Sequence, residues 1–402
     1  MGTVPVITVT GATHIGRAAP VAERLAAIGR AVAGRDDLVL RSVTYTAVDY
    51  PTHTIATEAL TRARLELAAP DGARVEARLF VKELRSAENW PMLGVVPPEL
   101  RADFVDGFPW RLEIAAYTGP LREQMPTGMR LPELYAVDEL GPGRAAMWLE
   151  DVDQPEVLEW DTARFARAAY LLGRMSARRR HGEVAPILAA AARFAEPDST
   201  LRYLVAGRIR NMFIPAIVGD DLWAHPVTAA ALAAVRDPGL IADLREWTTR
   251  LDRLLAYSDT LPMTYAHGDA SPQNLLVSAD DPDGFVAIDF GLDCPLPVGH
   301  DLGQLLVGLC HAGILAADRL PVISSIILAA HADGLAAEGH DATRDQIRGG
   351  YLSGLVLRSA FSAIPLETLA GPPTDELVAF WTERLRMTRV LLDLADEGLR
   401  LP

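Results

Sequence analysis

The sequence is poor in cysteine, and the little that it has is scattered. Its two cysteines, Cys294 and Cys310, form no CxxC pair and lie near no cluster of metal ligands. Two thiols in 402 residues exclude a disulfide framework and suggest a reducing compartment. We therefore expect both cysteines to be small, buried hydrophobic residues.

The sequence also lacks an excess of positive charge. It has 38 lysines and arginines against 53 acidic residues, a formal net charge of -15. This balance argues against a nucleic-acid partner, because a phosphate backbone attracts basic patches. An acidic chain is compatible with a cationic small-molecule substrate, although a solvated acidic surface explains the charge more simply.

Long hydrophobic runs and a targeting leader are missing as well. The N-terminal stretch MGTVPVITVTGATHIGR has no basic region followed by a long apolar core. The most apolar later stretch, LGQLLVGLCHAGILAA, is interrupted by Gln304 and His311 and is too short for a membrane span. We expect a buried helix there, no membrane partner and a cytoplasmic protein.

The length and composition indicate a large globular protein in two parts. Half of the 402 residues are hydrophobic, which suits two domains or one domain with two lobes. We expect an N-terminal extension at 1–37, a strand-rich lobe at 38–150 and a mostly helical lobe at 151–402. The junction near residue 150 is short and is interpreted as a hinge.

The first part of the sequence alternates between helical and strand patterns. Residues 21–33 have helical periodicity and end before Gly34. Residues 38–83 alternate apolar and polar side chains around the turn APDG, which predicts an antiparallel hairpin. A helix is predicted at 110–121, and a second strand pair in LPELYAVDEL and RAAMWLEDV.

The second part is predominantly helical. One apolar stripe is expected along a helix from Leu240 to Tyr257. Further helices are expected at 162–180, 299–316, 320–338, 343–364 and 374–398, and short strands only at 274–277 and 285–290.

Residues 267–274 read HGDASPQN, which is also what an ordinary polar turn is made of. The stretch holds a carboxylate, Asp269, and an amide, Asn274, and Asp289 follows at the end of an apolar strand. Phosphoryl transfer needs such a set. One carboxylate orients and deprotonates the attacking hydroxyl, while an amide oxygen and a second carboxylate hold the metal ion. Hard oxygen ligands suit Mg²⁺.

Together with AIDFG and the later GHDLGQLL, this stretch resembles the aminoglycoside phosphotransferase family. That family includes choline-kinase-like and ecdysteroid-kinase-like enzymes with a protein-kinase-like fold. The resemblance implies that Asp269 is the catalytic residue and that Asn274 and Asp289 bind Mg²⁺. It implies a structural role for Asp301. We expect His267 to brace the loop by hydrogen bonds and not to act as a base.

The same resemblance implies a nucleotide-binding N-terminal lobe. Lys82, one of very few lysines in an arginine-rich sequence, ends the strand RLFVKEL and is expected at the α- and β-phosphates. Glu113, in WRLEIAAY, is expected to pair with it; the plain alternative is a surface salt bridge of little worth. Glu150 and Asp151, in MWLEDVD, fall on the hinge strand that meets the adenine. The resemblance covers roughly residues 40 to 310.

One departure concerns the loop over the phosphates. The family often has glycine there, whereas AVDYPTHTIATEAL contains none. Thr52, Thr54 and Thr57 could donate hydroxyl groups, but the backbone cannot approach the nucleotide as closely as a glycine-rich loop does. The choice between ATP and GTP therefore stays open. So does the alternative of a nucleotide-binding pseudokinase or scaffold without turnover.

The N-terminal stretch ITVTGATHIG invites a different interpretation, as the start of a dinucleotide-binding unit. Its glycines are only Gly11 and Gly16, which does not match GxGxxG, and Pro20 interrupts the next helix. No alternating strand–helix pattern continues. A nicotinamide enzyme is thus the minor hypothesis, and the stretch is expected to be a flexible or strand-forming tail.

The sequence therefore predicts an α+β, two-lobed, protein-kinase-like fold. Its small antiparallel-sheet N-lobe carries one key helix, and its larger C-lobe is mostly helical. The expected activity moves the γ-phosphate of ATP, or GTP, to a hydroxyl of a small molecule, with Mg²⁺. The acceptor stays open between antibiotics and metabolites, and the oligomeric state stays open too.

Overall fold

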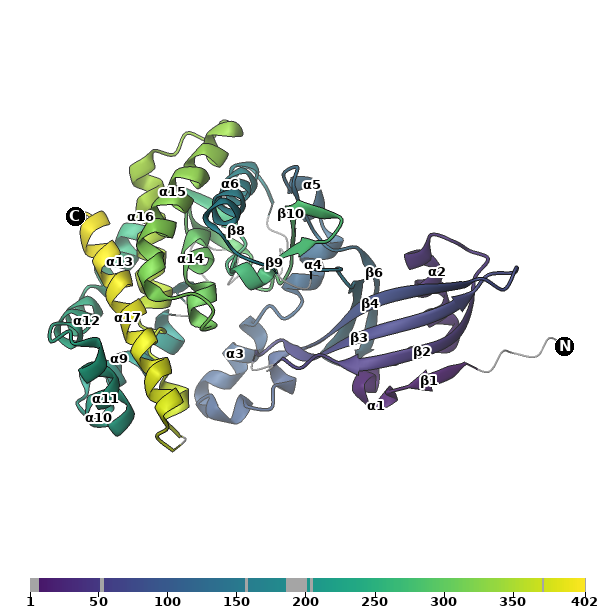
Figure 1. Ribbon diagram of the computed structural model, residues 1–402, viewed down its shortest axis with the longest axis horizontal. Coiled ribbons are helices and arrows are strands. Elements are labelled where there is room, and N and C mark those ends of the chain that lie inside the picture. Colours follow the sequence, from purple (N-terminus) through teal and green to yellow (C-terminus); the bar gives the residue numbers. More distant parts are fainter. Residues whose placement is uncertain are drawn as a thin grey trace. The chain divides into compact units, whose positions relative to one another are not determined.

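The computed structural model describes residues 7–50, 54–155, 158–185, 201–202, 205–370 and 372–401 (Figure 1). The chain divides into two compact units. Unit 1 consists of Met1–Arg122 and Leu131–Asp153, and unit 2 consists of Glu123–Arg130 and Gln154–Pro402.

Unit 1 is built on one six-stranded sheet with the order β1-β2-β3-β4-β7-β6. Every neighbouring pair is antiparallel except β1 and β2. The turn APDG joins β3 to β4, so the predicted hairpin is confirmed. The strands are β1 (Thr8–Thr10), β2 (Val39–Ala47), β3 (Thr57–Ala68), β4 (Arg74–Arg85), β6 (Leu134–Gly141) and β7 (Arg144–Glu150).

The helix α2 covers one face of this sheet. It ends at Gly34, whose φ of 64° is the left-handed conformation that glycine adopts without strain. Its Leu25 and Ile28 are buried in a core with the inward-facing residues of β3 and β4. The first helices are α1 (Ala12–Ile15), α2 (Ala22–Ala33), α3 (Arg101–Gly107), α4 (Leu112–Thr118) and α5 (Leu121–Gln124).

The N-terminal stretch that resembled a dinucleotide-binding unit is part of this sheet. Its strand β1 lies parallel to β2, and α1 and α2 connect the two strands. A Cβ on Gly11 would lie 2.2 Å from the carbonyl oxygen of Tyr45, so this glycine permits close contact with β2. The stretch is strand-forming, and the sheet continues antiparallel from β2, unlike a dinucleotide-binding sheet.

Unit 2 is mostly helical. The apolar stripe expected on one helix occupies two helices, because the helix is interrupted at Arg250. Its five apolar residues are all buried: Leu240, Leu244, Trp247, Leu251 and Leu254. The helices are α6 (Thr162–Arg178), α9 (Ile214–Val218), α10 (Asp221–Ala224), α11 (Pro226–Val235), α12 (Leu240–Thr249), α13 (Leu251–Ser258), α14 (Asp301–His311), α15 (Leu320–Ala337), α16 (Arg344–Gly354) and α17 (Asp375–Gly398), with π-helical segments at Val205–Phe213 and Leu355–Ala360.

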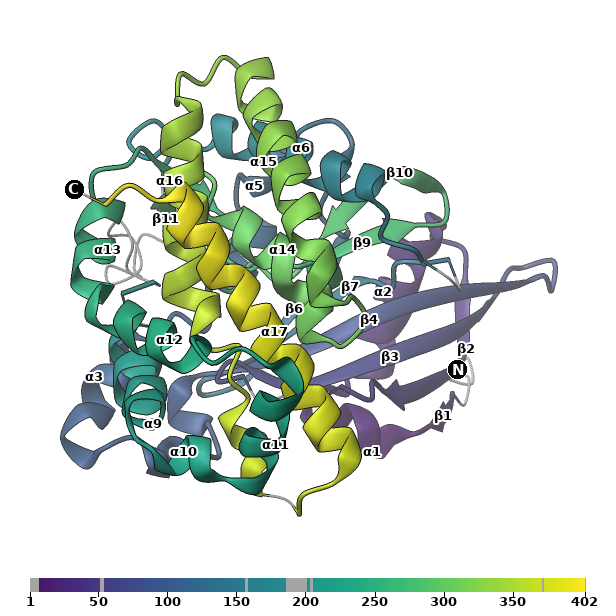
Figure 2. The same ribbon diagram turned by 60° about the vertical axis from the view of Figure 1, so that its left-hand side comes forward.

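The helices α6 and α15 pack at unusually short range (Figure 2). A Cβ on Gly173 would lie 2.3 Å from the carbonyl oxygen of His331, and one on Gly334 would lie 2.1 Å from that of Tyr170. By length and composition the stretch Ala317–Ala337 could also cross a membrane. In the structure the face of α15 that carries Gly334 packs against α6.

The strands of unit 2 form two small sheets, with the orders β5-β10-β9 and β11-β8. Three of them were not predicted: β5, β8 and β11. The strands are β5 (Met129–Arg130), β8 (Met263–Ala266), β9 (Leu275–Ser278), β10 (Asp281–Ala287) and β11 (Cys294–Pro297). A strand-rich unit 1 and a larger helical unit 2 confirm the predicted α+β class.

Candidate functional site in unit 2 and its counterpart in unit 1

The stretch HGDASPQN lies between β8 and β9 and is both a turn and a cluster of functional groups. Pro272–Asn274 forms a 3₁₀ turn. That turn brings Asn274 back to Asp269, so its Nδ2 donates to the main-chain oxygen of Asp269 at 2.8 Å and to Oδ2 at 3.2 Å. The five-residue spacing thus places the carboxylate and the amide in direct contact.

Asp301 and His267 fix the backbone of this loop by hydrogen bonds. The carboxylate of Asp301 accepts the amide hydrogens of His267 at 3.0 Å and of Gly268 at 2.9 Å. The buried His267 ring accepts from the amide of Asp269 through Nδ1 at 3.2 Å, and its Nε2 lies 2.8 Å from the carbonyl oxygen of Ile288. Since an amide can only donate, Nε2 carries the ring proton. His267 therefore braces the loop, as predicted.

Asp289 lies beside this loop in an unusual backbone conformation. Strand β10 ends at Ala287 and not at Asp289, which corrects the expected strand boundary. The amide of Ile288 donates to the carbonyl oxygen of Asn274 at 3.0 Å, so Asp289 is adjacent to the loop 267–274. Among the residues that the structure describes, only Asp289 and Arg236 are non-glycine residues with positive φ. Such conformations concentrate at functional sites.

The side chains of Asn274 and Asp289 suit a magnesium ion. Asn274 directs its Nδ2 at Asp269, so its Oδ1 is the atom that could ligate a metal ion, and Asp289 offers a carboxylate as a second ligand. No group of three or more His, Cys, Asp or Glu side chains in the described part of the chain could hold a metal. An ion bound here would need further oxygens from phosphate and water, which is the coordination that Mg²⁺ prefers.

In unit 1, Lys82 and Glu113 form a buried ion pair. The Nζ of Lys82 lies 2.6 Å from Oε2 of Glu113, and their side chains are 9% and 5% exposed. Glu113 is in the first turn of α4, and Lys82 is on β4 between β3 and β7. Lys82 is also the only lysine in the sequence. The predicted pair is thus present, and its burial distinguishes it from a surface salt bridge.

The expected hinge residues, Glu150 and Asp151, lie at the end of β7 in unit 1. Glu150 ends β7, and its Oε2 accepts from the amide of Glu133 at 3.1 Å. Its own amide donates to the carbonyl oxygen of Glu133 at 2.8 Å. Asp151 pairs with Arg62 at 3.1 Å. These contacts fix the chain at the end of the strand, and the adenine contact stays a prediction.

The glycine-free loop is held by a side chain that the sequence did not single out. Arg85, buried on β4, donates through Nε to the carbonyl oxygen of Ile55 and through Nη2 to that of Thr54, both at 3.1 Å. The hydroxyl of Thr54 accepts from the amide of Thr57 at 3.1 Å. Thr52 lies outside the described residues. Arg85 thus fixes the described end of this segment, at residues 54 and 55.

A second arginine, Arg358, contacts the predicted catalytic residue itself. Its Nη2 lies 2.7 Å from Oδ1 of Asp269, and its Nη1 donates to the carbonyl oxygen of Gly268. Arg358 belongs to the π-helical segment Leu355–Ala360 and is 89 residues away in sequence. No local pattern marks it, so sequence reasoning missed it.

The two cysteines of unit 2 are buried, as expected, and do not form a disulfide. Cys294 is on β11 and Cys310 near the end of α14. Burial raises the pKa of the Cys310 thiol to about 11. Neither cysteine is among the predicted site residues.

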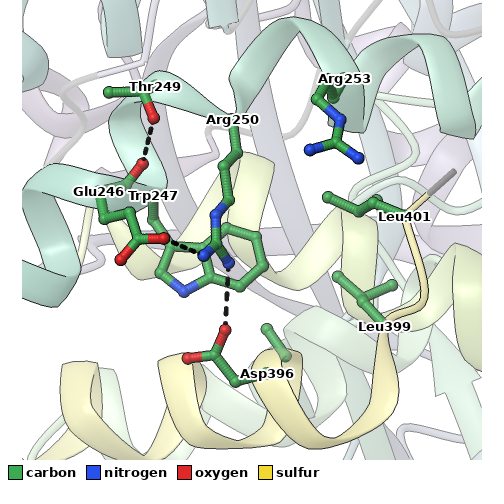
Figure 3. Close-up of a pocket in the computed structure, with 9 residues that line it drawn as sticks. Glu246, Trp247, Thr249, Arg250, Arg253, Asp396, Leu399 and Leu401 are labelled. Atoms are coloured by element: carbon green, nitrogen blue, oxygen red, sulfur yellow. Dashed lines mark hydrogen bonds and ion pairs between the residues drawn. The ribbon is translucent and has the colours of Figure 1, made fainter.

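A surface pocket of about 460 Å³ in unit 2 contains none of the predicted site residues (Figure 3). Arg250 lies over the ring of Trp247 at 4.6 Å and pairs with Glu246 and, at 3.2 Å, with Asp396. Its charge is therefore balanced within the pocket wall. The residues that line this pocket are therefore separate from those predicted for phosphoryl transfer.

Residues 143–320 match the phosphotransferase enzyme family (APH). This stretch contains Asp269, Asn274 and Asp289. It is a phosphotransferase-family region. The resemblance expected from the sequence is thus confirmed. None of the curated proteins compared with the chain matches it.

The chain is also similar, at low sequence identity, to several solved structures. An aminoglycoside phosphotransferase from Alicyclobacillus acidocaldarius is 14% identical, with 83% of this chain and 90% of that chain covered and a TM-score of 0.41. An amicoumacin kinase in complex with AMP-PNP, Ca²⁺ and its ligand is 10% identical, with 88% of both chains covered and a TM-score of 0.45. A GDP complex of an aminoglycoside 2'-phosphotransferase is 14% identical, with 87% and 92% covered and a TM-score of 0.44. Because the similarity to these structures is low, only the match of residues 143–320 to the family supports the phosphotransferase interpretation.

Proposed function

We propose that the protein transfers the γ-phosphate of ATP or GTP to a hydroxyl group of a small molecule. The observation that carries this proposal is the direct contact between Asp269 and Asn274 beside Asp289, inside the phosphotransferase-family region. The buried Lys82–Glu113 pair of unit 1 supports it, because a fixed ammonium group is what the α- and β-phosphates need.

Each residue has one task in this reaction. Asp269 accepts the proton of the acceptor hydroxyl through Oδ2. At the same time the oxygen of that hydroxyl bonds to the γ-phosphorus. The bond from the γ-phosphorus to the bridging oxygen breaks, and the nucleoside diphosphate leaves. Asn274 and Asp289 would hold Mg²⁺, which neutralises charge on the phosphates. Lys82, held by Glu113, positions the α- and β-phosphates.

Substitution of Asp269 tests the catalytic assignment. Asp269→Asn keeps the size of the side chain and removes the proton acceptor, so transfer should fall roughly 10³-fold while nucleotide binding stays. The measurement is phosphate transfer from ATP and GTP to a panel of hydroxyl acceptors, together with acceptor-free hydrolysis. Asp280→Asn, at an exposed position outside the set, is the matched control. Full activity in Asp269→Asn contradicts the assignment.

The single lysine gives a test of nucleotide binding that is independent of turnover. An acyl phosphate derivative of ATP transfers its acyl group to an amine near the phosphates. Mass spectrometry should find one acylated side chain, Lys82, and an excess of ATP or GTP should protect it. The nucleotide that protects better is the preferred donor. Acylation without any transfer or hydrolysis would favour the pseudokinase, and stabilisation by NAD alone would favour the nicotinamide enzyme.

A further inference from the structure

The carboxylate of Asp269 has a separate donor on each of its oxygens. Arg358 Nη2 lies 2.7 Å from Oδ1, and Asn274 Nδ2 lies 3.2 Å from Oδ2. The contact with Asn274 is the longer of the two, and Asn274 is the residue proposed to bind the metal through its Oδ1. Arg358 thus fixes Oδ1 of Asp269, and Oδ2 is the oxygen that can accept the proton of a hydroxyl group.

Arg358 anchors the backbone of the loop as well as the carboxylate. Its Nη1 donates to the carbonyl oxygen of Gly268, the residue immediately before Asp269. Gly268 has a φ of 79°, and a Cβ there would lie 2.2 Å from the carbonyl oxygen of Leu292. One planar guanidinium group therefore binds two consecutive residues at a tightly packed bend. Lysine, with a single ammonium group, cannot reproduce this fork.

Arg358 supplies positive charge beside two buried histidines. Burial, followed by the charge of Arg358, lowers the pKa of His300 to about 3. Burial, followed by the charges of Arg384, Arg358 and Arg208, lowers the pKa of His311 to about 3. Both histidines are neutral at pH 7. The side chain of Arg358 is 17% exposed, so its pair with Asp269 is only partly screened by solvent.

We propose that Arg358 is a positioning residue for phosphoryl transfer, which holds Oδ1 of Asp269 and the Gly268 carbonyl oxygen so that Oδ2 meets the acceptor hydroxyl. The inference rests on the proposed function for its catalytic meaning. Its structural content, that Arg358 orders the loop 267–274, is independent of turnover. The contact comes from a helix outside the family-matched stretch, which ends at residue 320.

The first test is a series of substitutions measured by acceptor-free hydrolysis of ATP with Mg²⁺. Arg358→Met should lower kcat about 100-fold and leave KM for ATP nearly unchanged, because the nucleotide does not need the Asp269 orientation to bind. Arg358→Lys should recover part of the loss. Added guanidinium at millimolar concentration should partly restore Arg358→Ala. Arg386→Met, which removes an exposed arginine of α17, is the control.

The second test is amide hydrogen exchange of residues 267–274 in the wild type, Arg358→Met and Arg386→Met. Exchange should accelerate in this loop only in Arg358→Met, with the thermal midpoint little changed. Unchanged exchange overturns the positioning role, whether or not the protein turns over. A raised KM with an unchanged kcat, or a kcat loss that neither lysine nor guanidinium recovers, also overturns it. A wild type without any turnover contradicts the proposed function alone.

Discussion

Under the proposed function, the acceptor hydroxyl binds beside Arg358, whose charge then affects which acceptors are accepted. A hydroxyl in contact with Oδ2 of Asp269 lies close to the guanidinium that holds Oδ1. The net charge of the chain is -15 and would by itself favour cationic acceptors. The carboxylate of Asp269 attracts an ammonium group on a neighbouring carbon, and the guanidinium of Arg358 behind it weakens that attraction.

We therefore predict that Arg358 lowers the preference for acceptors that carry an amine beside the reacting hydroxyl. At roughly 5 Å and an effective dielectric constant of about 20, the repulsion by Arg358 alone is about 3 kcal/mol before screening. The ratio of kcat/KM for an amine-bearing acceptor to that of its hydroxyl counterpart should therefore rise about tenfold or more in Arg358→Met. An unchanged ratio in that variant contradicts the prediction.

Glu83 is the neighbour of Lys82 on β4 and points to the opposite face, since side chains alternate along a strand. Burial, followed by the charge of the nearby Glu58, raises its pKa to about 7. A raised carboxyl pKa means that the folded protein binds more protons than the unfolded chain between pH 4.5 and 7. Its contribution to stability is therefore present below pH 4.5 and is lost as the pH rises through 7.

Glu83→Gln should remove this pH dependence. The free energy of unfolding of the variant should exceed that of the wild type at pH 8 by on the order of 2 kcal/mol and match it near pH 4.5. Denaturant titrations at both pH values measure it. Glu76→Gln, at an exposed position of the same strand, should change little at either pH. A wild type that gains stability from pH 5 to 8 relative to Glu83→Gln contradicts the assignment.

At the scale of elements, the contact between α6 and α15 depends on two glycines. Gly173 and Gly334 let each helix approach a main-chain oxygen of the other. His331, fully buried in the same contact, has its Nδ1 3.3 Å from the carbonyl oxygen of Ala169. Neither helix can move away without breaking this packing, so even one added methyl group must displace backbone.

Gly334→Ala should destabilise unit 2 by about 2–4 kcal/mol, more than an ordinary overpacking substitution, because the clash is with backbone. Gly173→Ala should act similarly. Thermal or denaturant unfolding measures the effect, and Asp333→Ala, at the exposed neighbouring position of α15, is the control. Equal stability of Gly334→Ala and Asp333→Ala would show that the helices can separate at little cost.

The elements that sequence patterns predicted are those with local signals. Alternation around APDG and helical periodicity before Gly34 are visible within a short window. Strands β8 and β11 have four residues each, and β11 contains two prolines, so no periodicity can mark them. Lys82 and Glu113 followed from motifs, whereas Arg358 and Arg85 act on residues far away in sequence. Such contacts depend on packing that no local pattern encodes.

At the scale of the molecule, the chain passes between the two units three times. Residues 123–130 belong to unit 2 although the sequence on both sides of them belongs to unit 1. This segment gives β5 to the β10 edge. It also supplies Gln124, whose Oε1 accepts from Nε of the buried Arg179 at 2.9 Å.

A chain cut to residues 154–402 should therefore fold poorly. It leaves Arg179, which is paired with Asp293 at 2.6 Å, without the Gln124 partner, and it exposes the edge of β10. A chain in which a flexible Gly/Ser segment replaces 131–153 and joins 123–130 to 154–402 should melt cooperatively at a higher temperature. Circular dichroism melts of the two chains decide it. Equal midpoints would mean that residues 123–130 contribute nothing to unit 2.

The burial of both native thiols makes spectroscopic labelling of this protein simple. With a pKa of about 11, only about one Cys310 thiol in 10⁴ is ionised at pH 7, and Cys294 is fully buried. Maleimide dyes should leave both untouched in the folded state, so cysteines can be added without first removing the native ones. One new cysteine on an exposed residue of each unit then accepts a donor and an acceptor dye. Energy transfer between the dyes, with and without nucleotide, reports directly whether binding changes the separation of the units.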